Sequence, residues 1–413
     1  MREADKFSVP KTFLLGCGFM GVSVIWSMYN AYVPVFLEKS FHLDTVAIGV
    51  VMTIDNIFAI VLLPFLGALS DRTRSPLGRR RPYILVGSIL AAVFFVMIPS
   101  ASAAQKLGLM MLFIVAMNLS MALFRTPVIT LMPDITPSRY RSQANGIINL
   151  MGGLGSLLVF FGGKPLYDRS PSLVFLVGGL AMLGLNLIVV FLIREPVLDP
   201  VTADKKAAAM GDAFRELLAN MKDVVKGEKS LLAILLAIFC WFVGYNAIET
   251  FFTLYAENYL KIGASTGTLI LGAFSVTFML TAVVAGLVAS RFGRRRTIRV
   301  GLGVVLVVML SSLFLKSFWP LVAVFLIGGF GWALVNVNSL PMVVDMTTPE
   351  KLGGYTGLYY FFSQAANIVS PPVAGALIDA FGYQSLMIYA AVLFLASILI
   401  VSLVRRGEAA PAS

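Results

Sequence analysis

Residues 67–82 read Gly67-Ala-Leu-Ser-Asp71-Arg72-Thr-Arg74-Ser-Pro76-Leu-Gly78-Arg79-Arg80-Arg81-Pro82, and long apolar segments flank this stretch at 46–69 and 83–99. Its five arginines cannot lie in hydrocarbon, so both apolar segments must end here at a membrane surface. Short loops rich in Lys and Arg stay on the cytoplasmic side. The stretch therefore predicts a short cytoplasmic turn between two membrane helices.

The composition is typical of an integral membrane protein. Of the 413 residues, 58% are hydrophobic and only 13% are charged, and the mean hydropathy is +0.88. A soluble chain of this size needs far more charge on its surface. The net charge of +11 lies in loops between apolar spans, which argues against a nucleic-acid partner. Cys17 and Cys240 fall within apolar spans, so we expect small core residues and no disulfide.

Apolar windows long enough to cross a bilayer, which takes about 20 residues, recur along the whole chain. We therefore expect an all-α membrane protein with twelve transmembrane helices in two pseudo-symmetric six-helix bundles. Most of the 32 lysines and arginines fall in loops on one side of the predicted membrane. Because basic loops stay inside, we expect both termini to be cytoplasmic and the protein to lie in the plasma membrane. The predicted spans are 12–37, 46–69, 83–102, 107–132, 144–166, 172–193, 230–256, 266–290, 298–316, 319–344, 355–377 and 384–404.

One long polar connection, 194–229, divides the chain into an N-terminal bundle (1–193) and a C-terminal bundle (230–413). A helix that binds a partner protein is one interpretation of this connection, but an amphipathic helix on the inner membrane surface fits better. The apolar residues at helical spacing, with lysines between them, are Phe214, Leu217, Leu218, Met221, Val224 and Val225.

Short motifs recur in the two halves, in the same order and at a nearly constant offset. This recurrence predicts a duplicated bundle, with a binding site where the halves meet near mid-membrane and a rocking motion that gives alternating access. The repeats are Tyr-Asn-Ala at 29–31 and 245–247, Gly-Arg-Arg-Arg at 78–81 and 293–296, and Asp134-Ile-Thr-Pro with its looser counterpart Asp345-Met-Thr-Thr-Pro.

The basic stretch at 67–82 resembles the signature loop of the major facilitator superfamily. Its elongated form, and the sequence Pro-Val-Ile-Thr-Leu-Met-Pro-Asp-Ile-Thr at 127–136, are similar to the branch of glycoside-pentoside-hexuronide:cation symporters and sucrose transporters. The resemblance implies a sugar carried together with a cation. The sequence departs from the branch at three places. No carboxylate precedes Pro64, where the melibiose-type sodium site has paired aspartates, and Asn118 and Ile129 replace an aspartate and an arginine of sucrose transporters. We therefore expect protons as the coupling ion and leave the sugar open.

Three ionisable residues within predicted spans are candidates for function, because charge in hydrocarbon is costly. Asp55, near the middle of the second span, is a candidate proton site, and a structural aspartate bonded to Asn56 is the alternative. Arg125 offers five donors to sugar hydroxyls or to a substrate carboxylate, and a structural ion pair with Asp55 is its alternative. Glu249 is a candidate proton site or substrate ligand, or a structural carboxylate at a helix break.

Neutral polar side chains in the spans are candidate substrate ligands, because amides bond hydroxyls and aromatic rings stack on sugar faces. Hydrogen bonding between helices is the alternative for the amides and hydroxyls, and a core or lipid-facing position is the alternative for Trp26. The candidates are Trp26, Tyr29, Asn30, Asn118, Tyr245, Asn246, Gln364 and Asn367.

The charged hairpin itself is expected to act as a gate. Its arginines could meet Asp134, or carbonyls at helix ends in the opposite half, and so hold the inner side shut. Membrane topology alone would explain the arginines but not Asp71 or Gly67. The candidate gating residues are Gly67, Asp71, Arg72, Arg79, Arg80, Arg81, Asp134 and Asp345.

The sequence contains no ATP-binding loop, metal-binding cluster or nucleophile motif, so we expect no enzyme activity, no metal and no cofactor besides a coupling ion. The favoured function is secondary active transport, by proton symport of a sugar, in a protein expected to be monomeric in the lipid bilayer. The alternatives are an exporter of amphipathic small molecules and a transporter-like sensor or lipid-handling protein without solute flux.

Overall fold

The computed structural model describes residues 8–136, 140–195, 229–346 and 352–407, and within these ranges the regular structure is entirely helical. The helices form two compact units. The first unit contains Met1–His42 and Ile54–Met210, and the second contains Leu43–Thr53 and Gly211–Ser413. The predicted fold is confirmed. The segment Leu43–Thr53, which the sequence assigns to the N-terminal bundle, belongs to the second unit.

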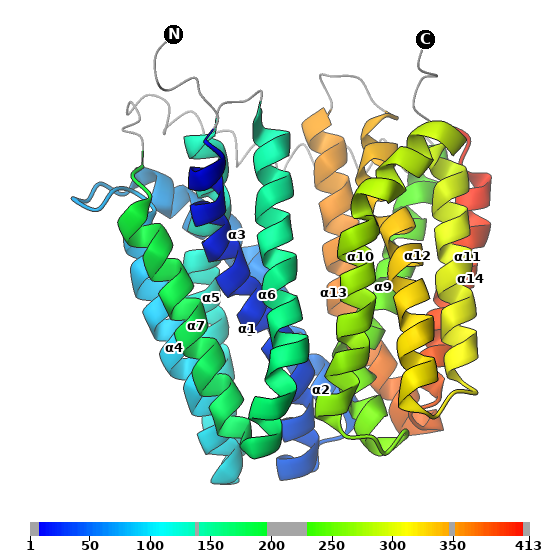
Figure 1. The fold of residues 1–413 in the computed structure, drawn as a ribbon, viewed down its shortest axis with the longest axis horizontal. Helices are drawn as coiled ribbons and strands as arrows, with labels where there is room; N and C mark the ends of the chain where they lie inside the picture. The colour runs from blue at the N-terminus through cyan, green and yellow to red at the C-terminus, as the bar shows by residue number, and fades with distance from the viewer. Residues whose placement is uncertain (1–7, 137–139, 196–228, 347–351, 408–413) are drawn as a thin grey trace. The chain divides into compact units, whose positions relative to one another are not determined.

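The first unit contains α1 (Val9–Phe41), α3 (Ile54–Arg72), α4 (Arg81–Ala103), α5 (Leu107–Ile135), α6 (Arg141–Arg169) and α7 (Pro171–Leu192). The second contains α2 (Thr45–Val51), α9 (Lys229–Asn258), α10 (Ala264–Phe292), α11 (Arg294–Ser312), α12 (Phe318–Val344), α13 (Leu352–Phe381) and α14 (Ser385–Leu403), as Figure 1 shows. The predicted amphipathic helix at 214–225 lies outside the described residues.

The two units use the same set of helix pairs. In the first, α1 packs on α6 and α7, α4 packs on α5 and α7, and α3 packs on α5. In the second, α9 packs on α13 and α14, α11 packs on α12 and α14, and α10 packs on α12. The same pairing of six successive helices in each half supports the duplication inferred from the short motifs.

Ten helices in the described part are long and apolar enough to cross a membrane. Small residues let the helices approach closely, as is usual between membrane helices. On α6, a Cβ on Gly155 would lie 2.5 Å from the carbonyl oxygen of Met20 on α1. On α11, a Cβ on Gly301 would lie 2.5 Å from the carbonyl oxygen of Gly331 on α12. Cys17 and Cys240 are free thiols.

The second predicted span, 46–69, is not one continuous helix. It breaks at Met52 and Thr53, between α2 and α3. The Thr53 hydroxyl donates to the carbonyl of Gly49 at 2.8 Å, within α2, and to the carbonyl of Ile368 at 3.4 Å, on α13. As a result, Asp55 lies in the first turn of a new helix and not in the middle of a long one. Interrupted membrane helices commonly occur beside binding sites.

Candidate functional site

Five of the predicted residues come together in the first unit, on three helices. Trp26 and Tyr29 lie on α1, Asp55 on α3, and Asn118 and Arg125 on α5. The guanidinium carbon of Arg125 lies 5.8 Å from the centroid of the Trp26 ring, within the range of a cation–π contact. The Trp26 and Tyr29 rings meet edge to face with their centroids 5.7 Å apart. A cation, a carboxylate and two aromatic rings therefore share one region of the unit.

Asp55 and Arg125 lie near enough for their opposite charges to attract each other, but no direct ion pair joins the two side chains in the described residues. The Asp55 carboxylate also accepts a hydrogen bond of 3.0 Å from the Asn56 amide. The structure is therefore compatible with both predictions for Asp55, the proton site and the structural aspartate. Opposite charges placed together offset part of the cost of removing each from water.

Several buried polar groups in this region have no hydrogen-bond partner within the described part of the chain. Tyr29 is fully buried and Asn118 is 2% exposed. The Tyr29 hydroxyl lies beside the Asn118 side chain, but neither group makes a hydrogen bond of regular geometry. The indole nitrogen of Trp26 and the hydroxyl of Thr126 are also buried and unpaired. Each such group costs about 1–3 kcal/mol, so a ligand with hydroxyl groups would relieve a real penalty here.

The corresponding residues of the second unit are arranged differently. Tyr245 on α9 stacks on Trp332 of α12, with centroids 4.4 Å apart and ring planes 3° from parallel. The charge of Glu249, one helical turn further along α9, acts on the Tyr245 hydroxyl. Sequence reasoning missed Trp332, although an indole among the polar residues of the 319–344 span is a usable signal.

The amides of the second unit bond to one another. The Asn246 amide on α9 donates to the side-chain carbonyl of Asn367 on α13, and the Asn367 amide donates to Gln364 at 2.8 Å. This is the interhelical alternative considered for these residues. Asn30, on α1 of the first unit, is half-buried.

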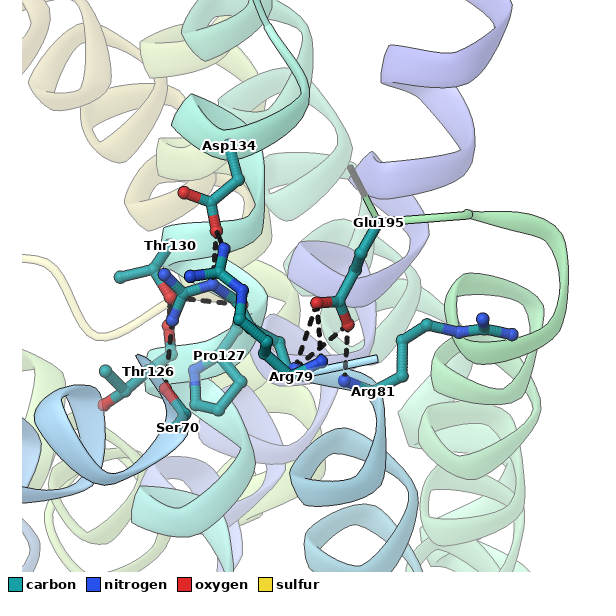
Figure 2. Close-up of polar contacts among 9 residues, drawn as sticks. Ser70, Arg79, Arg81, Thr126, Pro127, Thr130, Asp134 and Glu195 are labelled. Carbon is teal, nitrogen blue, oxygen red and sulfur yellow. Dashed lines mark hydrogen bonds and ion pairs between the residues drawn. The ribbon is translucent and has the colours of Figure 1, made fainter. Parts of the chain in front are cut away.

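The basic hairpin of the first unit folds onto its own helix ends. Asp134, at the end of α5, accepts from Nε of Arg80 at 2.5 Å and from a terminal guanidinium nitrogen of Arg79 at 3.2 Å. Arg80 is only 2% exposed and also donates to the Ser70 hydroxyl on α3 at 3.0 Å (Figure 2). The ends of α3, α4 and α5 are thereby joined by one buried guanidinium.

Glu195, which follows α7, holds the backbone of the same hairpin. Its carboxylate accepts the N–H groups of Arg79, Arg80 and Arg81 at 2.8–3.2 Å, at the N-terminus of α4, where free N–H groups and the helix dipole favour an anion (Figure 2). Gly78 has φ +106°, and a Cβ there would lie 2.9 Å from the Glu195 carboxyl. The glycine is therefore required for both conformation and space.

The hairpin of the second unit repeats this construction. Gly293 has φ +87° and precedes α11. Arg294 forms an ion pair with Asp345 and donates to the carbonyl of Pro341 at 3.2 Å, at the end of α12. Arg295 donates to the carbonyl of Ser402 near the end of α14, as Arg81 donates to that of Val190 on α7.

Each of these arginine contacts joins residues of one unit. Whether the hairpins act as gates stays a prediction. Of the predicted gating residues, Gly67, Asp71 and Arg72 are outside the part of the chain whose side-chain environment is described.

A further polar contact joins α2 to α13 in the second unit, and sequence reasoning missed it. One carboxylate oxygen of Asp379 accepts the Thr45 N–H at 2.9 Å and the Thr45 hydroxyl at 2.6 Å, and the other accepts the Val46 N–H at 3.0 Å. A Cβ on Gly375 would overlap the backbone of Thr45, and one on Gly49 would overlap that of Pro371. The two helices therefore touch backbone to backbone.

Curated proteins and solved structures resemble this chain. The isoprimeverose transporter of Lactiplantibacillus pentosus is 22% identical over 67% of this chain and 58% of its own length. The multidrug resistance protein MdtG of Salmonella choleraesuis is 25% identical over 90% of this chain and 89% of its own. The first of these relatives is thus matched over little more than half of its length.

Two crystal structures share the fold. The nucleoside transporter NupG matches with a TM-score of 0.70 at 15% identity, over 96% of this chain and 99% of that one. A bacterial homologue of the human lysosomal transporter Spinster matches with a TM-score of 0.70 at 14% identity, over 96% and 95%. The family model described as "MFS/sugar transport protein" matches residues 14–404. Because this match covers nearly the whole chain, the protein belongs to this sugar-transport family of the major facilitator superfamily and is a multi-pass membrane protein.

Proposed function

We propose that the protein is a secondary active transporter that carries a sugar or glycoside together with a proton by alternating access. The observation that supports this most directly is the first-unit cluster, where Asp55 and Arg125 interact beside the unpaired groups of Trp26, Tyr29 and Asn118. A sugar presents hydroxyls to such donors and acceptors and an apolar face to an aromatic ring. The relative named isoprimeverose transporter agrees with this substrate class.

Coupling would follow from the Asp55–Arg125 interaction. In this scheme the charged carboxylate attracts the guanidinium and so opposes its hydrogen bonding to substrate oxygens. A proton on Asp55 removes that attraction and leaves Arg125 available to substrate oxygens. Substrate binding then favours the protonated carboxyl, and by linkage the proton favours substrate binding to the same degree. Glu249 is a second candidate for the proton site, because its charge acts on the Tyr245 hydroxyl beside Trp332.

The test is uptake of labelled sugars by proteoliposomes with and without an inward proton gradient. Asp55→Asn should abolish accumulation driven by the gradient and leave exchange of internal for external sugar intact. Asp168→Asn is the matched control, because Asp168 forms an ion pair of 2.6 Å with Lys164 on the α6 surface. This variant is expected to accumulate sugar normally. Gradient-driven accumulation in both Asp55→Asn and Glu249→Gln would contradict this coupling scheme.

Export of amphipathic compounds is the second candidate. Export is favoured by the alignment with the multidrug resistance protein over 90% of this chain, and by the stacked aromatic rings of Tyr245 and Trp332. Energised cells that express the protein would then retain less of a lipophilic cationic dye and show no sugar uptake. Sugar uptake with unchanged dye retention supports the symporter.

We further propose that the protein works as a monomer in the plasma membrane, with both termini and both arginine hairpins in the cytoplasm. The concentration of arginines at the starts of α4 and α11 supports this orientation. Single cysteines at position 74 or 296, in a variant without Cys17 and Cys240, should be protected from an impermeant thiol reagent in intact cells. Labelling of these cysteines in cells that have not been permeabilised would show that the hairpins face the outside and would contradict the proposed orientation.

A further inference from the structure

Three helices of the second unit converge where α11 begins. Arg295 on α11 donates to the carbonyl of Ser402 on α14. The N–H of Arg405, just past α14, donates at 3.2 Å to the hydroxyl of Ser230 in the first turn of α9. The start of α9, the start of α11 and the end of α14 therefore lie together, and α11 packs along α14 (Figure 1).

Exposed cations gather at this convergence. Arg294 and Arg295 are used internally, by Asp345 and by the carbonyl of Ser402. The exposed cations that remain are Lys229, Arg296, Arg299, Arg405 and Arg406. In the described ranges, the side chains of Lys229, Arg296, Arg299 and Arg405 make no hydrogen bond or ion pair. Like charges this close repel one another, so the surface favours an anion.

An apolar surface continues from these cations along both helices. On α11, Arg296 and Arg299 begin an exposed stripe that goes on through Val300, Val307 and Leu310, which are 59%, 61% and 44% exposed. On α14, the exposed stripe toward the same end consists of Leu395, Leu399 and Leu403. Eleven residues of helix separate Arg299 from Leu310, or about 16 Å, which is close to half of a hydrocarbon core of about 30 Å.

We propose that this surface binds an anionic phospholipid, with its phosphate among Arg296, Arg299 and Arg405 and its acyl chains along α11 and α14. Guanidinium groups hold phosphate oxygens through paired, charge-assisted hydrogen bonds. The continuous apolar stripe favours a lipid over a free phosphate ion. Basic sites between membrane helices recognise anionic headgroups in this way. The bias of positive charge toward one side would explain the cations but not their convergence from three helices, next to an exposed apolar stripe on each of the packed helices α11 and α14.

The experiment measures lipid binding to the full-length purified protein by native mass spectrometry and by thermal stabilisation in detergent. Phosphatidylglycerol, phosphatidylcholine and inorganic phosphate are compared. Phosphatidylglycerol should bind and stabilise, and the other two should not. Removing the three guanidinium charges together, as R296Q/R299Q/R405Q, should weaken phosphatidylglycerol binding by about fivefold for each charge and about a hundredfold in total.

Two further variants keep the result interpretable. Replacing Lys106, Arg169 and Lys261 by Gln removes three exposed charges elsewhere and should leave phosphatidylglycerol binding unchanged. The triple Arg→Lys variant keeps the charge and should retain most of the binding. The single variants R296Q, R299Q and R405Q, each expected to weaken binding about fivefold, replace the triple Gln variant if that one does not fold. Equal binding of the two lipids, equal stabilisation by inorganic phosphate, or an equal loss in the control variant would overturn the proposal.

Discussion

Asp379→Ala is expected to loosen α2 from α13 without changing the rest of the second unit. In the structure, the Asp379 carboxylate accepts the two backbone N–H groups of Thr45 and Val46 and the Thr45 hydroxyl, at 2.6–3.0 Å. Asp44 separately accepts the N–H of Ala47 at 2.7 Å. The first turn of α2 is thus capped by one carboxylate from its own segment and one from α13.

The expected loss of free energy in Asp379→Ala depends on which groups take over the hydrogen bonds of the lost carboxylate. Hydrogen bonds to a charged acceptor contribute about 1.5–3 kcal/mol each when buried, and loss of a helix cap costs about 0.5–2 kcal/mol. Asp379 is exposed, so water takes over part of its role for the two N–H groups. The Thr45 hydroxyl keeps its second bond of 2.6 Å to the Gly375 carbonyl. We therefore expect a loss of about 1–2 kcal/mol, or about 5–30-fold in the open fraction of the contact.

The assay is hydrogen exchange of peptides from α2 and from the end of α13, with the protein in lipid nanodiscs. Asp379→Ala should speed exchange in both by about 5–30-fold, because the lost bonds join the two helices. Asp44→Ala is the matched control. It removes a cap of similar size from α2 alone, so it should speed exchange in α2 and leave α13 unchanged. If the two variants give the same pattern, or if Asp379→Ala changes neither peptide, the contact does not hold these helices together.

Two further contrasts use matched variants within the chain. Asp134→Ala should lower stability by about 3–5 kcal/mol because it removes the carboxylate that balances the charge of the buried Arg80. Asp345→Ala removes a carboxylate that is 39% exposed and should cost about 1 kcal/mol or less, and equal losses of thermal stability would contradict the difference in burial. Asn118→Ala removes only a contact of irregular geometry with the Tyr29 hydroxyl, so it should weaken sugar binding and leave the melting temperature nearly unchanged. Asn367→Ala removes the hydrogen bond to Asn246, so it should lower the melting temperature and leave sugar binding nearly unchanged. Sugar binding is measured by fluorescence titration and stability by a melting curve for both variants.

The helices and the duplication could be predicted from the sequence because they depend on local properties. The length of an apolar segment and its charged ends are contained within about 20 residues. The repeated Gly-Arg-Arg-Arg motifs gave the correct correspondence between the hairpins, and Asp134 was expected as a partner of the arginines. The role of Glu195 was not expected, because a carboxylate that caps a distant helix leaves no periodic signal in its own segment.

The contact between α2 and α13 could not be predicted in the same way. Thr45 and Asp379 are 334 positions apart, and each is unremarkable in its own loop or helix end. The break at Met52 and Thr53 left a weak local trace, since Thr53 and Asp55 are residues that favour helix starts. The strong apolar run on both sides outweighed that trace. The consequence for the site is that Asp55 lies beside a helix break, where backbone and side chain share the same polar surroundings.

The two halves of the duplicated fold have diverged in the way their polar groups are satisfied. In the first unit the buried hairpin guanidinium of Arg80 bonds to Asp134 and Ser70, while the buried side chains of Tyr29 and Asn118 meet without a hydrogen bond of regular geometry. In the second unit the ion pair of Asp345 is partly exposed, while Asn246 and Asn367 bond to each other. Unsatisfied groups are costly to keep in a membrane interior, and a bonded network is costly to break for a ligand. We therefore predict that the substrate recognition proposed above depends more on the first unit, and helix-to-helix cohesion more on the second.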